Sequence, residues 1–205
     1  MLAGVDVAVA VNASQWQCLA KAGVQWSVAR GWHSYGAMDQ QCESNLKGAA
    51  AAGIKQRDVY LFPCRGKPAS EQVTTMLRNL DPSTFHRVWL DVEENPSPGC
   101  SWSDPHEEDN CAFVTALALA VQSTAGVPLG VYSNHHDWNR TVGDHCILPG
   151  ELPPLWYAHY DRDPSTCTDF LPFGGWSRPF AKQYSDHSAS LDKACGISPD
   201  ISITC

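Results

Sequence analysis

The chain has 205 residues, of which 43% are hydrophobic and 18% charged, and this balance excludes a disordered chain and favours one globular domain over residues 1–205. The formal charge of -8, from 14 basic and 22 acidic residues, gives no indication of nucleic-acid binding. The longest apolar run, at 112–121, is about half the roughly 20 residues of a membrane-spanning helix. We expect a monomer that binds neither nucleic acid nor membranes.

Strand-like and helix-like segments alternate along the chain. The predicted strands are Gly4–Val9, Gln25–Gly31, Asp58–Pro63, Arg87–Glu93, Pro128–Ser133, Leu155–Tyr160, Pro179–Tyr184 and Pro199–Ile203. The predicted helices are Ser14–Gly23, Asp39–Ala52, Ser70–Leu80, Glu107–Thr124 and His135–Val142. Repeating βα units imply a parallel sheet, and eight strands imply an α/β, TIM-like barrel with mostly parallel strands and about five helices, a (βα)5(β)3 arrangement. An open doubly wound sheet is the alternative, but no glycine-rich phosphate motif follows the first strand.

Nine cysteines are spread along the chain, at positions 18, 42, 64, 100, 111, 146, 167, 195 and 205. No two of them form a CxxC pair, so a cysteine zinc site is not expected. Such a density is typical of disulfide-bonded proteins in oxidising compartments, which predicts secretion to the extracellular space or to a lysosomal or digestive lumen. Because the number is odd, at least one thiol is left unpaired.

Two carboxylates share one face of the fourth predicted strand. Side chains alternate along a strand, so Asp91 and Glu93 point to the same side, with Cα atoms about 6 to 7 Å apart. One charge at that distance raises the pKa of the other group, and such a pair can divide the roles of proton donor and charge stabiliser. Glu93, nearer the strand end, is the candidate proton donor, although an isolated DxE is more often a strand that ends in solvated acids.

Two further acids fall on strands that become neighbours when a barrel closes. Asp6 lies on the first predicted strand and Asp200 on the last. Catalytic groups of parallel barrels sit at the carboxyl ends of the strands, so four acids at one mouth favour a hydrolytic site over four unrelated structural acids. Asp6 alone would more simply be a buried acid bonded to backbone amides.

Aromatic residues on the middle strands form the second constellation. The candidates are Tyr60, Phe62, Tyr132, Trp156, Tyr160 and, in the next loop, Trp176. A cleft with flat apolar walls and a few polar groups suits an oligosaccharide, whose sugar rings stack on aromatic faces. Each aromatic residue singly is more often part of a core, and we expect about half of them to contact substrate.

The neighbouring histidines His135 and His136 are a weaker candidate for a metal site. Adjacent residues point apart on a helix, and the HExxH spacing of zinc hydrolases is absent. A helix start explains this segment better, so we expect no metal and no cofactor. No local signature singles out a catalytic cysteine.

Several segments resemble, in order and spacing, glycoside hydrolase family 25, the barrel-shaped lysozymes, and in particular their invertebrate and protist branch. The segments are Gly4–Val7, Asp58–Cys64, Val88–Glu93, Leu155–Tyr160, Phe173–Trp176, Lys182–Tyr184 and Asp200. The resemblance implies a barrel of eight strands and five helices that cleaves, with retention and without a cofactor, the β-1,4 bond between N-acetylmuramic acid and N-acetylglucosamine in bacterial peptidoglycan. It further implies that Glu93 is the acid/base and that Asp91, Asp6 and Asp200 position substrate and stabilise charge.

Three alternatives stay open. Chitinase-like barrels of family 18 have a related mechanism, but their longer acid motif requires acids at the positions of Trp89 and His86. A carbohydrate-binding or inhibitory protein on an inactive scaffold would keep the aromatic residues and lose the proton donor, whereas this chain has Glu93. The attacking group, a carboxylate or the acetamido oxygen of the substrate, is not decided by sequence.

Overall fold

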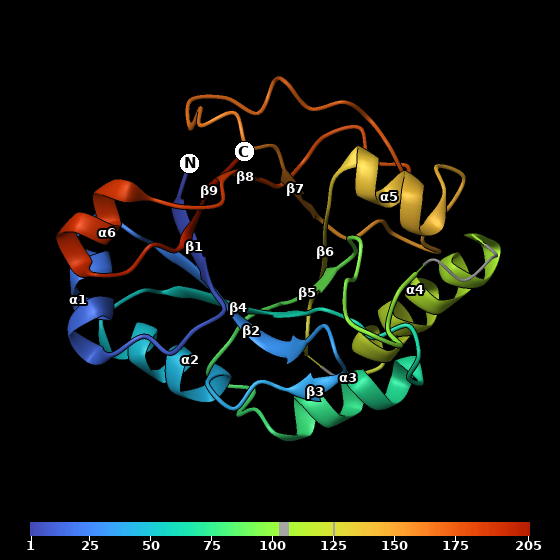
Figure 1. Ribbon diagram of the computed structural model, residues 1–205, viewed down its shortest axis with the longest axis horizontal. Helices are drawn as coiled ribbons and strands as arrows, with labels where there is room; N and C mark the ends of the chain where they lie inside the picture. Colours follow the sequence, from blue (N-terminus) through green and yellow to red (C-terminus); the bar gives the residue numbers. More distant parts are fainter. Residues whose placement is uncertain (103–106, 125) are drawn as a thin grey trace.

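The computed structural model describes residues 1–102, 107–124 and 126–205, and within them one sheet and six helices (Figure 1). The strands are β1 (Ala3–Val7), β2 (Trp26–His33), β3 (Ala37–Met38), β4 (Gln56–Leu61), β5 (Val88–Asp91), β6 (Leu129–Ser133), β7 (Leu155–Ala158), β8 (Ala181–Ser185) and β9 (Asp200–Thr204). The helices are α1 (Ala13–Lys21), α2 (Cys42–Ala51), α3 (Ala69–Arg78), α4 (Glu107–Gln122), α5 (His135–Val142) and α6 (Ala189–Cys195).

The sheet closes into a barrel. Its strand order is β1-β9-β8-β7-β6-β5-β4-β2-β3, and an additional pairing of β1 with β2 completes a ring of eight strands, with β3 attached to β2 alone. All neighbours in the ring are parallel except β8–β9 and β1–β9. The TIM-like barrel predicted from the sequence is confirmed, and the open doubly wound sheet is excluded.

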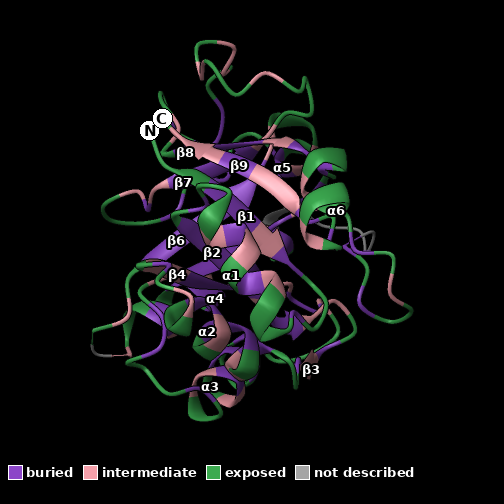
Figure 2. Ribbon diagram, turned by 90° about the vertical axis from the view of Figure 1, so that its left-hand side faces the viewer, coloured by how far each residue is buried: buried purple, intermediate pink, exposed green. Residues whose placement is uncertain are grey.

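Alternating side chains divide the core into two layers. Val88, Leu90 and Val92 belong to the large outer core between strands and helices, as the alternation predicts. Trp89 belongs instead to a smaller cluster inside the barrel, made of Trp26, Val28, Trp89, Tyr132, Trp156 and Ala181. Buried residues accordingly concentrate on the strands in Figure 2, and the outer faces of the helices are exposed. The next inward residue after Trp89 is Asp91, so the tryptophan layer forms the floor beneath that carboxyl group.

Two glycines make room for the inner tryptophans. A Cβ atom added at Gly4 would lie 2.4 Å from a ring atom of Trp26, and one at Gly130 would lie 2.4 Å from a ring atom of Trp89. Both indole N–H groups donate to the same carboxylate oxygen of Asp58, at 2.8 and 3.0 Å. A buried charge is tolerated when it is hydrogen-bonded in this way.

Four disulfides confirm the predicted framework. They join Cys18 to Cys195, Cys64 to Cys100, Cys111 to Cys146 and Cys167 to Cys205. Cys42 is the free thiol, and it is buried. The first bridge links α1 to α6, and the ends of the chain lie side by side (Figures 1 and 2), where the Thr204 N–H donates to the Leu2 carbonyl.

The structure differs from the sequence prediction in two short elements and in several boundaries. α6 and the two-residue β3 were not predicted, and α2 begins at Cys42 rather than at Asp39. Asp39 instead accepts hydrogen bonds from the Arg30 guanidinium and the Gln41 backbone N–H, which holds it outside the helix. In the described part of the chain, no helix is long and apolar enough to span a membrane.

Candidate active site

One cavity of about 240 Å³ opens at the mouth of the barrel, at the carboxyl ends of the parallel strands. It is lined by Asp6, Arg30, Ser34, Tyr60, Phe62, Asp91, Glu93, Tyr132, Trp156, Tyr160, Gln183 and Asp200. The structure therefore brings together all four acids and five of the six aromatic candidates, without Trp176. This is the end of a parallel barrel at which enzymes of this architecture place their chemistry.

Asp6 and Asp200 meet across a pair of antiparallel strands. They are direct register partners on β1 and β9. Asp200 is the first residue of β9, and it reaches the mouth because β9 runs antiparallel to β1. Two like charges directly opposite each other repel. Burial and the neighbouring Asp200 carboxylate hold the pKa of Asp6 well above its usual range, so this pair retains a proton at pH values where an exposed aspartate is ionised.

Asp91 and Glu93, at the end of β5, differ in how far they are buried. Asp91 is 6% exposed, and its Oδ1 atom is buried without a hydrogen-bond partner among the described residues. Burial, and then the negative charges of Glu93 and Asp6, raise the pKa of Asp91 well above its usual range. Glu93 is partly exposed, and burial together with the charges of Asp137 and Asp200 raises its pKa to about 7.

Comparison with known proteins identifies the family. A family model described as lysozyme-like protein 1 matches residues 1–184. A Dictyostelium discoideum protein named probable GH family 25 lysozyme 2 is 34% identical over 204 residues, which is 98% of this chain and 89% of the relative. The chain belongs to the glycoside hydrolase family 25 lysozymes. It is accordingly a glycoside hydrolase, and the resemblance noted in the sequence is confirmed.

One further relative and one solved structure are also similar to this chain. Counting factor 50, also from Dictyostelium discoideum, is 35% identical over 203 residues, and the match covers 96% of this chain but 63% of that protein. The solved structure of a muramidase from Trichobolus zukalii superposes with a TM-score of 0.78 over 100% of this chain and 94% of the other, at 16% identity. At that identity the structural likeness establishes the shared barrel fold.

Three residues that line the cavity at the mouth of the barrel were not predicted as site residues: Arg30, Ser34 and Gln183. The alternation of strand residues holds a signal for two of them. Trp26 and Val28 face the inside of the barrel, so Arg30, the next residue in that period of two, does so too. Ala181 likewise faces inward and precedes Gln183 by two positions. Ser34 follows β2 and has no comparable signal.

Arg30 is the one basic residue among those that line the cavity. Its Nε atom donates to Asp39 Oδ2 at 2.8 Å, and its Nη2 atom donates to the Ala8 carbonyl at 2.7 Å. These two bonds fix the guanidinium against the wall. The cavity thus combines four carboxyl groups with one positioned cation.

The aromatic residues differ in how far they reach the opening. Trp156 is 2% exposed, donates to Ser202 Oγ at 3.1 Å, and packs edge-on against Tyr132, so it forms part of the floor. Tyr160 is 49% exposed, and Tyr60 and Phe62 are partly exposed, which makes these three rings available to a ligand.

Trp176 lies outside this cavity. Its indole donates to the Pro153 carbonyl at 2.7 Å, and its ring packs against Trp138 in the outer core. It borders a larger cavity of about 990 Å³ at the opposite end of the barrel. None of the described residues that line that cavity has a carboxylate or imidazole side chain, so it lacks the paired acids of the smaller cavity.

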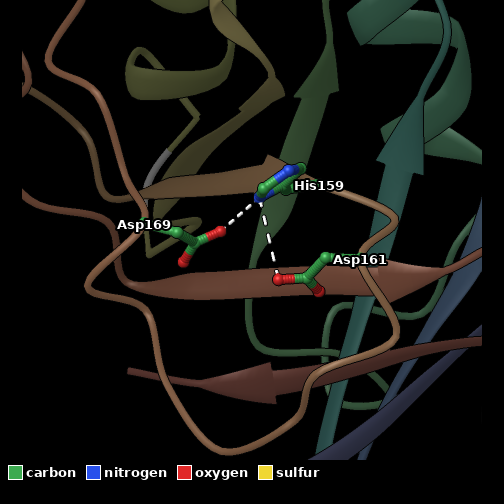
Figure 3. A group of neighbouring side chains, drawn as sticks. All are labelled: His159, Asp161 and Asp169. Atoms are coloured by element: carbon green, nitrogen blue, oxygen red, sulfur yellow. Dashed lines mark hydrogen bonds and ion pairs between the residues drawn. The ribbon is translucent and has the colours of Figure 1, made fainter.

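The predicted absence of a metal site stays a prediction. Among the described residues, one group of three side chains could hold a metal ion. His159, Asp161 and Asp169 come together in the loop after β7 (Figure 3). The buried ammonium of Lys182 lies 2.5 Å from Asp161 Oδ2 and 3.1 Å from Asp169 Oδ2. Because this lysine already pairs with both carboxylates, a divalent ion would have to compete with its charge. His135 is directed to Asp144 instead, at 3.4 Å.

We therefore expect hydrolysis to be independent of added metal. Dialysis against an excess of a chelator should leave the rate within about twofold of the untreated protein. The reason is that the acidic side chains of the site are carboxyl groups with raised pKa values and do not form a ligand set for zinc. The measurement is the clearing of a suspension of bacterial cell walls before and after chelation. Loss of clearing that is restored by zinc or magnesium would contradict this expectation.

Proposed function

We propose that this protein is an N-acetylmuramidase that hydrolyses the β-1,4 bond between N-acetylmuramic acid and N-acetylglucosamine in bacterial peptidoglycan, with net retention and with Glu93 as general acid/base. The observation that carries the proposal is the position of Glu93, whose pKa is raised to about 7, in a cavity shared with three further acids. The family assignment supports the substrate and the stereochemistry.

Glu93 is suited to donate a proton to a glycosidic oxygen. A general acid has to be protonated at the working pH and yet acidic enough to release its proton, and a pKa of about 7 meets both conditions in mildly acidic to neutral solution. In a retaining reaction the same carboxylate then removes a proton from the attacking water. Burial contributes most to the raised pKa, so the surrounding wall is itself part of the catalytic apparatus.

The other three acids hold the substrate, and those that are ionised at the working pH stabilise positive charge. The transition state of glycoside hydrolysis resembles an oxocarbenium ion, which negative groups in a partly dry cavity stabilise. Asp91 is the candidate for direct contact with the sugar, because its buried Oδ1 atom has no protein partner among the described residues. Asp6 and Asp200, on the adjoining strands β1 and β9, complete the acidic wall.

The accessible rings are proposed to bind the glycan. Tyr60, Phe62 and Tyr160 offer apolar faces at the mouth, whereas Tyr132 and Trp156 support them from below. An oxidising location, extracellular or lysosomal, is supported by the four disulfides. A monomer with peptidoglycan as its macromolecular partner is the simplest assembly for a site formed within one chain.

The test is an analysis of the products from purified peptidoglycan. Mass spectrometry of the released fragments should show new reducing ends at N-acetylmuramic acid, and proton NMR during the first minutes should show the β anomer before mutarotation. Reducing ends at N-acetylglucosamine would refute the bond assignment, and an initial α anomer would refute retention. Preferred cleavage of chitin oligosaccharides would favour the chitinase-like alternative, and binding of peptidoglycan without cleavage would favour the inactive scaffold.

A further inference from the structure

Gln183 lines the cavity and contacts two of its acids and two of its tyrosines. It lies on β8, between β7 and β9, and is 2% exposed. Its Nε2 atom donates to Asp6 Oδ1 at 2.9 Å and to Asp200 Oδ2 at 3.3 Å. Its Oε1 atom accepts from the hydroxyl groups of Tyr132 at 2.6 Å and Tyr160 at 2.8 Å. The two donors and two acceptor positions of the carboxamide are all used.

The direction of these four hydrogen bonds follows from chemistry. Whenever Asp6 or Asp200 is ionised, its carboxylate only accepts hydrogen bonds, so the NH₂ end of the amide faces this pair. With the amide reversed, its carbonyl oxygen would face the two acids and its NH₂ group would face the two hydroxyls. That arrangement sets oxygen against oxygen beside a pair of like-charged groups and is unfavourable whenever either acid is ionised.

The orientation of the amide determines what the tyrosines can offer to a substrate. Each phenol has one proton, and the hydroxyl oxygens of Tyr132 and Tyr160 lie 2.6 and 2.8 Å from Gln183 Oε1 but 3.4 Å from each other. Because the contacts to the amide are the shorter ones, both protons are directed to Gln183 Oε1. Their oxygen lone pairs are then left for a donor in the cavity. A sugar hydroxyl or an acetamido N–H group is such a donor, whereas a carbonyl or carboxylate oxygen of a substrate is not.

We propose that Gln183 is a positioning residue of the glycosidase site, whose carboxamide keeps Asp6 and Asp200 as hydrogen-bond acceptors and turns the Tyr132 and Tyr160 hydroxyl oxygens toward hydroxyl or N–H donors of the glycan. The role rests on the proposed function, because it concerns the same cavity. It adds a distinct claim, that one neutral side chain determines which groups of this wall accept hydrogen bonds from the substrate. The wall is formed by β1, β6, β8, β9 and the segment after β7.

The test uses Gln183→Met and Gln183→Glu in the full chain. Methionine keeps the length of the side chain and removes all four hydrogen bonds, so the Asp6 and Asp200 carboxylates lose a shared donor and the acidic limb of the pH–rate profile should move up by about one pH unit. Glutamate adds a negative charge beside Asp6, Asp200 and Glu93, so both limbs should move up. We expect kcat/KM on peptidoglycan to fall about tenfold or more in each variant.

The matched control is Gln56, at the other end of the barrel. It also donates to a buried carboxylate, Asp58 Oδ1 at 2.8 Å, but does not line the cavity. Gln56→Met and Gln56→Glu should therefore change thermal stability without moving either limb of the profile. If Gln183→Met behaves in the same way, with lower stability and an unmoved profile, Gln183 is structural only and the proposal is overturned.

A second measurement does not require enzymatic activity. The protein is labelled with ¹³C at the aspartate carboxyl groups and studied by NMR. The Asp6 and Asp200 resonances are assigned with the variants Asp6→Asn and Asp200→Asn. Their chemical shifts are then followed as a function of pH in wild type and Gln183→Met, which gives a titration midpoint for each group. The proposal expects their midpoints to rise in the variant, and unchanged midpoints overturn it. A wild type that cleaves no peptidoglycan but shows this shift would refute the proposed function and leave the role of Gln183 supported.

Discussion

Glu93→Gln is expected to lower the rate of peptidoglycan hydrolysis by about 10²- to 10⁴-fold, the range typical for loss of a general acid. Glutamine has nearly the same shape, so the walls of the cavity stay in place and the change removes the transferable proton alone. The rate is measured by the release of reducing ends from purified peptidoglycan at the pH optimum of the wild type. Binding of the glycan should be retained, because Tyr60, Phe62 and Tyr160 are untouched.

The neighbouring glutamate provides the control for this substitution. Glu94 is exposed, forms an ion pair with Arg140, and does not line the candidate active-site cavity. Glu94→Gln should keep the rate within about twofold of the wild type, since exposed ion pairs contribute little to stability. The assignment of the acid fails if Glu93→Gln is as active as the wild type, or if both variants lose activity to the same degree.

The site was predictable because strand alternation and barrel closure are simple geometric rules. Asp91 and Glu93 were placed on one face by the period of two, and Asp6 was brought to Asp200 because the first and last strands of a barrel are neighbours. The same alternation identifies Gln183 as inward-facing once Ala181 is known to be inside. A neutral amide gives no chemical signal of its own in a sequence, whereas an acid near a strand end does.

Other features depended on contacts that no local pattern records. α6 is a helix of seven residues, capped by the Ser188 side chain and tied to α1 by the Cys18–Cys195 disulfide, whose two cysteines are 177 residues apart in sequence. The pairing of eight cysteines likewise follows from the closed fold rather than from their spacing. Trp176 illustrates the converse, because this aromatic loop residue belongs to the outer core and borders the cavity at the opposite end of the barrel.

The clustered acids also predict how stability depends on pH. The thermal unfolding temperature should fall as the pH rises from about 5 to about 8, because each acid with a raised pKa binds its proton more tightly in the folded than in the unfolded chain. This applies to Glu93 and Asp200, each with a pKa of about 7, and to Asp6 and Asp91. Their stabilising contribution is complete below the unfolded pKa of about 4 and is lost as the pH passes the folded value.

The magnitude is large for a protein of this size. A glutamate whose pKa rises from 4.5 to about 7 contributes at most about 3 kcal/mol at low pH. If the coupled acids together lose about 4 kcal/mol between pH 5 and 8, the unfolding temperature falls by roughly 10 °C for a chain of about 200 residues. His33 opposes this trend, because burial and the Arg30 charge lower its pKa, but it is a single group. The measurement is differential scanning calorimetry across this pH range.

The variant that isolates the effect is Glu93→Gln combined with Asp200→Asn. Without these two carboxyl groups, and with less repulsion on Asp6 and Asp91, the folded chain takes up fewer extra protons near neutrality, so the unfolding temperature should fall less steeply over the same range and be higher than that of the wild type at pH 8. Burial still raises the pKa of Asp6 and Asp91, so part of the slope remains. Asp81 serves as the reference, because hydrogen bonds from Ser83 lower its pKa and its contribution is lost only in more acidic solution. Asp81→Asn should keep the wild-type slope. A wild type that becomes more stable from pH 5 to 8 would mean that the acids are solvated and ionised, and Glu93 would then have no proton to donate.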